Sequence, residues 1–195
     1  MKHDRLPALP VEQWTEEQRA HVDEIIRGPR GALLPPFVPL LRSPELMGHA
    51  QRMGEYLRYR SALGLRLSEL AILVTARQWS QQVEWAIHAP IAEREGVSPE
   101  TILAIAEGRR APHMPADDAA VHDFCIELHR DRGVSDSTWA DALARFGERG
   151  VVDLLGINGY YTFLSMVMNA ARTGVPPSAA AAELPRWDHA PGRRC

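Results

Sequence analysis

Lysine is almost missing from this chain of 195 residues. Of its 22 cationic side chains only Lys2 is a lysine, and the others are arginines. Schiff-base enzymes, including those that hold pyridoxal phosphate, need a lysine in the site, and Lys2 falls in a predicted N-terminal arm. The net charge of −3 shows no bias toward nucleic acid or an anionic membrane. We therefore expect neither of these partners, and no lysine-bound cofactor.

Cysteines and long apolar runs are also scarce. Cys125 and Cys195 are far apart and form no Cys-x-x-Cys pair, so neither a disulfide framework nor a cysteine-based zinc site is indicated. No stretch reaches ~18 uninterrupted apolar residues, and residues 1–24 contain no apolar run typical of a secretion signal. These absences predict a cytoplasmic protein without a transmembrane helix.

The alternation of apolar and polar residues that marks β-strands is absent, whereas helix-start patterns recur. Ser43-Pro44-Glu45 and Ser98-Pro99-Glu100 each place a cap before a proline at the first helical position. Ser68-Glu69 is predicted to open another helix. We expect an all-α fold. It divides into an N-terminal arm over residues 1–14, one compact helical domain over 15–175 and a flexible C-terminal tail over 176–195.

The last helical segment, about residues 151–172, is apolar almost all round. A separate helix over 136–146 is expected to precede it. A helix without a polar face is either a central core helix or an interface helix, and we favour both roles at once. The sequence therefore predicts a homo-oligomer that assembles through apolar helices.

Glu84 and His88 are the first candidates for chemistry. They are four residues apart, so on a helix they share one face and can touch. A Glu and a His at the edge of a core can exchange a proton near neutral pH, and the neighbours Val83, Trp85 and Ile87 are apolar. The alternative is a pair that only decorates a helix surface, worth a few tenths of a kcal/mol.

Three further charged residues are less specific candidates. Glu69 can be a site residue, or simply an acid in the first turn of a helix after the Ser68 cap. Arg77 and Arg60 can each bind a substrate carboxylate through two hydrogen bonds. Because arginine is so common in this chain, neither position stands out.

A metal site is a further alternative. Glu84 and His88 can supply two ligands, with one of three other histidines completing the set. These are His49, His122 and His129. No His-Glu-x-x-His or paired-histidine spacing supports this interpretation, and we expect no metal and no cofactor.

Three segments together resemble the carboxymuconolactone decarboxylase superfamily, which also contains the AhpD-type alkylhydroperoxidases. They are Leu67-Ser-Glu-Leu-Ala-Ile-Leu-Val-Thr-Ala-Arg77, Val83-Glu-Trp-Ala-Ile-His-Ala-Pro90 and Gly159-Tyr-Tyr-Thr-Phe-Leu-Ser-Met-Val-Met-Asn169. The resemblance extends over about residues 6–172. It implies an AhpD-like all-α domain that forms trimers or hexamers, with a site near subunit contacts, and a place in the breakdown of aromatic compounds.

The peroxidase branch of that superfamily carries a glutamate followed by Cys-x-x-Cys-x-x-x-His. By this pattern Glu69 matches the glutamate and His88 the histidine, whereas the cysteine positions hold Gln81 and Glu84. The histidine that lies between the cysteines is replaced by Val83. Thiol chemistry needs a thiolate, so this chain resembles a branch that keeps the proton-handling residues and has lost both thiols.

The resemblance therefore implies a decarboxylase-like enzyme. We expect cofactor-free acid/base chemistry, decarboxylation or isomerisation with ring opening, on a small organic acid or lactone. The expected catalytic residues are Glu69, Glu84 and His88. The expected substrate-binding residues are Arg77, Trp85, Tyr160, Tyr161 and Asn169. The alternatives are a metal-assisted enzyme that uses Glu84 and His88 as ligands, or an oligomeric binding protein without catalytic activity.

Overall fold

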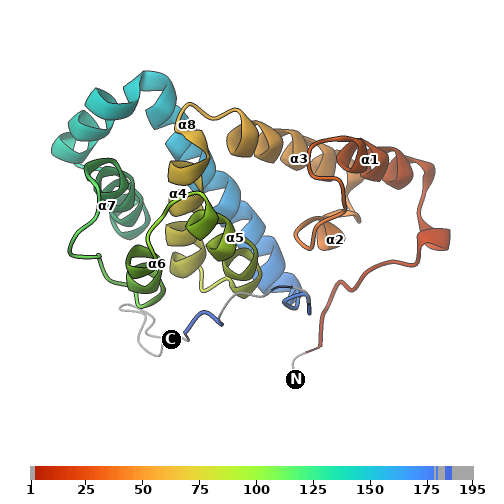
Figure 1. The fold of residues 1–195 in the computed structure, drawn as a ribbon. Coiled ribbons are helices and arrows are strands. Elements are labelled where there is room, and N and C mark those ends of the chain that lie inside the picture. Colours follow the sequence, from red (N-terminus) through yellow and green to blue (C-terminus); the bar gives the residue numbers. More distant parts are fainter. Residues whose placement is uncertain (1–2, 178, 180–182, 186–195) are drawn as a thin grey trace.

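The computed structural model describes residues 3–177, 179 and 183–185. Within these residues the regular secondary structure is helical, without a strand. Figure 1 shows a bundle around α4, α5 and α8, with α1, α2 and α3 extending to one side. The elements are η1 (Val11–Gln13), α1 (Glu16–Arg27), α2 (Phe37–Leu40), α3 (Pro44–Tyr59), α4 (Gly64–Gln78), α5 (Gln82–Arg94), α6 (Pro99–Ala106), α7 (Ala116–Asp131) and α8 (Asp136–Ala171). The predicted all-α fold is thus confirmed.

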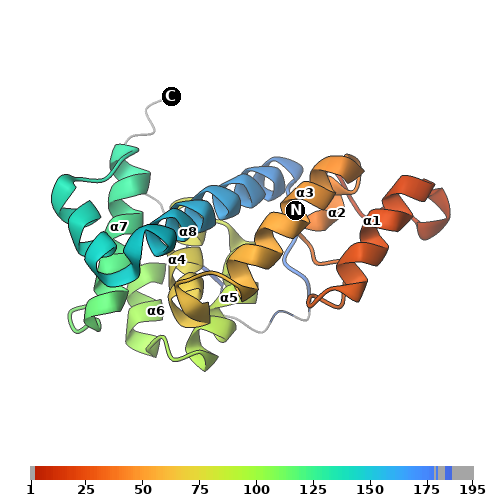
Figure 2. The same ribbon diagram turned by 90° about the horizontal axis from the view of Figure 1, so that it is seen from above.

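Helix α4 is the centre of the domain. Every residue from Leu67 to Arg77 is buried, because α5, α7 and α8 pack around the helix. Figure 2 shows α4 beneath α8, with α5 and α7 on either side. A helix enclosed in this way is apolar on most of its surface, so the polar residues that α4 buries need partners inside the protein.

Two of the three helix starts predicted from the sequence, those of α3 after Ser43 and of α6 after Ser98, are confirmed. The side chain of Ser98 accepts a hydrogen bond from the Thr101 N–H at the start of α6. Thr15 and Gln18 form a reciprocal capping box at the start of α1. Ser43 stands at the N-cap position of α3, but its hydroxyl makes no capping hydrogen bond.

The predicted start of α4 at Ser68-Glu69 is wrong. The helix begins four residues earlier, at Gly64, whose positive φ of 74° allows the chain to turn there. The Ser68 hydroxyl donates to the Gly64 carbonyl within the helix instead of capping it. Glu69 is therefore beyond the first turn and fully buried, so it is not a solvated acid at a helix start.

Helix α8 bends at Gly147, where the backbone leaves the helical region with φ 65° and ψ 176°. This break separates the two predicted helices, about 136–146 and 151–172. Within the described residues, α8 alone is long and apolar enough to cross a membrane by length and composition, and 56% of the apolar window is buried inside the domain. Burial of this extent also occurs in the core helix of a soluble protein.

Two segments differ from their expected form. Residues 31–39 are rich in proline, which predicts a loop or irregular turn, but residues 37–39 form the first part of α2, and Phe37 is buried. Part of the predicted tail lies against the domain. Leu184 is buried there, and its backbone N–H and carbonyl both hydrogen-bond to the Gln82 side chain. The predicted domain boundaries stay predictions, and residues 178, 180–182 and 186–195 of the tail lie outside the described part.

Candidate active site

A tight turn between α4 and α5 brings the candidate residues together. Ser80 has a positive φ of 47°, and Gln81 then caps α5 by accepting a hydrogen bond from the Val83 N–H at 2.6 Å. The same Gln81 side chain donates to Asn169 on α8. Helix α5 therefore runs back along α4, and residues 19 positions apart in sequence become neighbours.

His88 lies between two carboxylates. Its Nδ1 is 2.6 Å from Oε2 of Glu69 on α4, and its Nε2 is 3.2 Å from Oε2 of Glu84, one turn earlier on α5. All three side chains are at least 95% buried. When both ring nitrogens face carboxylate oxygens, both can donate only if the ring is protonated.

The electrostatics favour that protonated form. Burial alone lowers the pKa of His88, but charge attraction and hydrogen bonds from Glu69 and Glu84 outweigh burial and raise this pKa from 6.5 to about 9. A buried ion pair of this kind is stable only when its geometry and hydrogen bonds compensate for lost hydration. His88 is therefore an imidazolium at neutral pH, and it can act as a proton donor.

Two tyrosines from α8 complete the wall beside His88. The ring of Tyr161 meets the His88 ring edge-on, with centroids 5.2 Å apart, and Tyr160 packs on Tyr161 in the same way. Burial, followed by the nearby glutamates, raises the pKa of Tyr161 well above its usual range. Burial also raises the pKa of Tyr160, against the opposing effect of Arg30. Both hydroxyls therefore stay protonated.

A small cavity of about 20 Å³ lies on the Glu84 side of this group. That volume holds about one water molecule. Glu84 and His88 line it, whereas Glu69 lies behind the His88 ring. The other lining residues are Arg30, Leu34, Pro36, Phe37, Arg58, Ile87, Tyr160, Tyr161 and Leu164. Two of the three acid/base residues, Glu84 and His88, thus lie at the cavity, whereas Glu69 orients the His88 ring.

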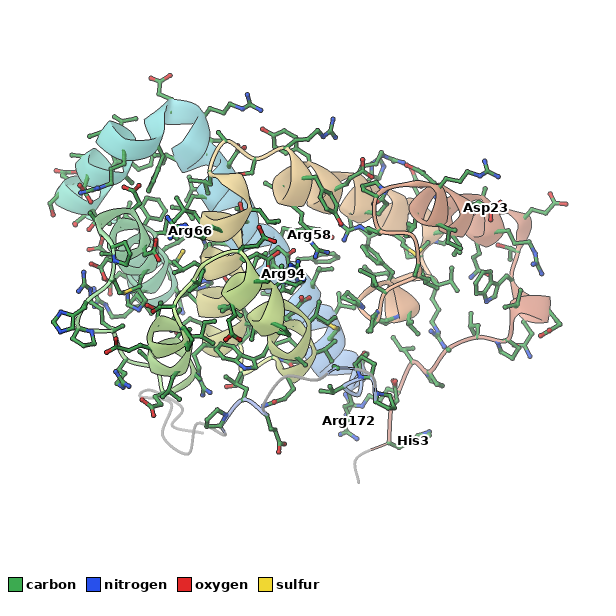
Figure 3. The ribbon with its side chains drawn as sticks, viewed as in Figure 1. His3, Asp23, Arg58, Arg66, Arg94 and Arg172 are labelled. Atoms are coloured by element: carbon green, nitrogen blue, oxygen red, sulfur yellow. The ribbon has the colours of Figure 1, made fainter. Side chains whose placement is uncertain are left out.

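Two arginines at the cavity were not singled out from the sequence. Arg58 Nε lies 3.7 Å from Glu69 Oε1, too far for a direct hydrogen bond. Figure 3 shows Arg58 in the interior, between α3 and α4. Arg30 donates to Gln51 and lies over the Phe37 ring. Among so many arginines, no local pattern marks these two. Arg58 comes from α3 and Arg30 from the segment between α1 and α2, and only tertiary packing brings them to the site.

Several polar atoms around the cavity lack partners. Within the part of the chain that the structure describes, Arg58 Nε, Glu69 Oε1 and Glu84 Oε1 are buried without a hydrogen bond. Leaving such groups unsatisfied costs about 1–3 kcal/mol each. Arg58 and Glu84 line the cavity together with Arg30 and Tyr160, whose Nη2 and hydroxyl also lack partners within the described residues, so the cavity suits a bound water or polar ligand.

Gly54 of α3 makes room for the cavity wall. A Cβ at this position would lie 2.2 Å from the Tyr160 hydroxyl and 2.6 Å from a guanidinium nitrogen of Arg30. Both side chains reach the cavity across the α3 backbone. Any other residue here would displace them.

Three of the predicted binding residues lie outside this cavity. Arg77 donates to the carbonyls of Ala106 and Pro185, and burial lowers its pKa. Asn169 bonds to Gln81 and to the Trp79 carbonyl. Trp85 lines a separate, mostly apolar groove of about 490 Å³ between α5, α6 and residues 183–185.

The ligand set of the metal alternative is not assembled. His49 lies beside Arg52, His122 beside Asp123 and His129 beside Thr75, and none of them lines the cavity. Within the described residues, no three His, Cys, Asp or Glu side chains form a group suited to a metal ion. Both His88 nitrogens already face carboxylates.

The described part of the chain also brings no thiol to the site. Its cysteine, Cys125, is buried on α7 and accepts a hydrogen bond from Asn158. Burial raises the pKa of this thiol to about 12. A thiol in this state is not a nucleophile.

Comparison with protein families gives one match, which covers the part of the chain that carries this site. Residues 44–122 match the model of the carboxymuconolactone decarboxylase family. The matched segment spans α3 to α6 and the first part of α7, and it contains Glu69, Glu84 and His88. This match, over 79 of the 195 residues, supports the resemblance to the carboxymuconolactone decarboxylase superfamily. No curated protein matches the chain.

Proposed function

We propose that this protein is a cofactor-free acid/base enzyme, a lyase or isomerase that transfers protons at a carbon of a small organic acid or lactone. The single observation that carries the proposal is the placement of His88 between Glu69 and Glu84 at a buried cavity. The family match supports a carboxymuconolactone decarboxylase-like activity at the level of the family.

The three residues take different roles in this proposal. Glu69, behind the ring, fixes the orientation of His88 and its Nδ1 proton, and so acts as a positioning residue. His88 donates its Nε2 proton to the substrate. Glu84, whose contact to His88 is longer and whose Oε1 lacks a hydrogen bond, accepts a proton from the substrate or from water.

This pairing of an acid with a base suits two related reactions. In an isomerisation, Glu84 removes a proton next to a carbonyl and His88 returns one elsewhere. In a decarboxylation, the carboxylate leaves as carbon dioxide, and His88 protonates the carbon that retains the electron pair. The guanidinium groups of Arg30 and Arg58 and the Tyr160 hydroxyl stabilise the negative charge that develops in either case.

The substrate needs a way into the cavity. A cavity of about 20 Å³ is smaller than a small organic acid, so the cavity lining has to open for a substrate to enter. We propose that the segment that carries Leu34, Pro36 and Phe37 is the part that moves. This segment lies just before α2 and includes its first residue, Phe37. Its three lining residues are the ones that lie closest together in the sequence.

An isotope-exchange assay tests the proposal. The protein is incubated in D₂O with a panel of lactones and small keto and unsaturated acids, and NMR follows deuterium entry and loss of the carboxyl group. We expect wild type to catalyse one of these changes and both His88→Gln and Glu84→Gln to lose it by at least 100-fold. His113→Gln, on an exposed position away from the cavity, serves as the matched control. Equal activity in His88→Gln and wild type would contradict the proposal.

A further inference from the structure

A mostly apolar groove of about 490 Å³ lies beside α5 and α6, separate from the His88 cavity. Among the described residues, no side chain lines both spaces. The groove presents apolar side chains of α6, among them Ile102 and Leu103, and Leu103 is 54% exposed. A volume of this size is in the range of pockets that bind a ligand, so the groove has room for an occupant.

The chain itself forms one side of this groove. Residues 183–185 lie along it, below α5 and α6 in Figure 1. Gln82 bonds to both the backbone N–H and the carbonyl of Leu184, and Arg77 donates to the Pro185 carbonyl at 2.6 Å. These three hydrogen bonds fix the position of the chain at the edge of the groove, immediately before residue 186.

A tryptophan follows closely after this anchor. Pro185 lines the groove, and only Arg186 separates it from Trp187. Because an extended chain advances at most about 3.6 Å per residue, the Cα of Trp187 is within about 7 Å of the Cα of Pro185. An indole ring at this distance can reach the groove while the anchor stays in place. Such a ring removes about 150–250 Å² from water when it is buried.

The groove and the segment that follows it carry opposite charges. The charged residues that line the groove are Glu93 and Glu183, and neither forms an ion pair within the part of the chain that the structure describes. Residues 186–195 lie outside that part, and they contain three arginines and one aspartate. Because exposed ion pairs are weak, the ring supplies most of the affinity, and the charges favour this segment over an acidic one.

Two other occupants are less favoured. The acidic side chains at the groove repel the anionic lipids of a membrane surface. The same segment of a second copy has to compete with the chain's own segment, which is tethered at Pro185. A short tether gives an effective concentration on the order of millimolar, so the chain's own segment has the advantage.

We propose that the Trp187 side chain occupies this groove of its own chain, with arginines of residues 186–195 beside Glu93 and Glu183. The ring then packs against α5 and α6 together and holds one helix against the other. Because α5 carries two of the three acid/base residues, the segment braces the helix of the candidate active site from outside. This packing is independent of the reaction that the site catalyses.

The first experiment is fluorine NMR of the full chain labelled with 5-fluorotryptophan. The chain has five tryptophans, and the signal missing from Trp187→Phe belongs to Trp187. We expect this signal to differ from that of free 5-fluorotryptophan and to change little between H₂O and D₂O, because the packed ring is shielded from solvent. In Leu103→Gln, which makes the groove more polar, we expect the signal to move to the solvent-exposed position.

Val152→Gln is the matched control, because Val152 is 63% exposed on α8 and lies outside the groove. It should leave the Trp187 signal in place. A solvent-exposed Trp187 in the wild-type protein, or equal effects of the two substitutions, overturns the proposal. A Trp187 signal that becomes solvent-exposed on dilution also overturns it, in favour of a groove filled by a second copy of the chain.

The second experiment asks whether the groove opens when the ring is removed. Trp187→Ala should bind the neutral dye Nile red several times more strongly than wild type, and Leu103→Gln in the same chain should abolish the gain. Trp139→Ala, which removes a 40% exposed tryptophan of α8, is the control. Equal dye binding by wild type and Trp187→Ala overturns the proposal. A small molecule released in stoichiometric amount from the denatured wild-type protein overturns it in favour of a free ligand.

Discussion

His88 Nδ1 lies 2.6 Å from Glu69 Oε2, although the two residues are 19 positions apart and belong to different helices. The contact depends on the turn at Ser80 and on the burial of both α4 and α5. It gives a buried glutamate the partner that its charge requires. It also fixes which nitrogen of the ring faces the cavity, and this orientation underlies the proposed chemistry.

Protein stability should fall at alkaline pH because of His88. The folded-state pKa of about 9 lies above the unfolded value near 6.5, so the stabilisation is complete below about pH 6.5 and is lost as pH rises through 9. The shift corresponds to on the order of 3 kcal/mol. Urea unfolding between pH 6 and 10 measures this loss. His88→Gln should show a weaker dependence over pH 7–9, and an equal slope would contradict this assignment.

Gly54→Ala should damage the site without touching an acid/base residue. The new methyl would collide with the Tyr160 hydroxyl and Arg30, and overpacking of this kind costs about 1–3 kcal/mol. We expect a lower melting temperature and reduced activity in the exchange assay. Gly133→Ala, where a Cβ meets nothing within 4 Å, should change stability by less than about 0.5 kcal/mol. Equal effects of the two substitutions would count against close packing at Gly54.

Arg58 and Arg77 should respond differently to substitution by Met. Arg77 holds two backbone carbonyls, so Arg77→Met should lower the free energy of unfolding by about 2–3 kcal/mol and leave the KM of an anionic substrate unchanged. Arg58 lines the cavity, so Arg58→Met should raise that KM by roughly tenfold or more. Steady-state kinetics and urea unfolding separate the two effects. A raised KM for Arg77→Met would restore its predicted role in substrate binding.

Gln82 should control the segment that contains Leu184. Its side-chain amide bonds to both backbone groups of Leu184, and residues 183–185 close one side of the groove next to Trp85. In Gln82→Ala, we expect faster hydrogen exchange at Leu184, with little change in the core of α4. Gln78→Ala, outside these contacts, is the control. Unchanged exchange at Leu184 would show that other contacts hold the segment.

The helical fold was predictable because its determinants are local. Caps at Ser98 and Ser135 and the break near Gly147 mark helix ends in the sequence itself. The start of α4 was placed too late, because Ser68 has the composition of a cap but sits inside a helix that Gly64 begins. The local sequence pattern cannot decide whether Ser68 caps a helix or lies inside one when tertiary packing buries the whole segment.

The site was predictable only in part, for a related reason. The Glu84–His88 contact follows from helical spacing, whereas the Glu69 contact was accessible only through the family pattern. Arg58 on α3 and Arg30, between α1 and α2, reach the cavity through tertiary packing that no local pattern records. Conversely, Arg77 and Asn169 belong to the sequence segments that contain the site residues, but their side chains do not reach the cavity. Arg77 donates to the Ala106 carbonyl, and Asn169 donates to the Trp79 carbonyl at the turn before α5.

The protonation state of His88 tests the central claim most directly. NMR titration of the imidazole nitrogens, assigned by the signal missing from His88→Gln, measures its pKa. We expect an imidazolium at pH 7 with a pKa of about 9, and a lower pKa in Glu69→Gln, because Glu69 is the strongest of the charges that favour the protonated ring. A neutral His88 at pH 7 in the wild-type protein would contradict the account.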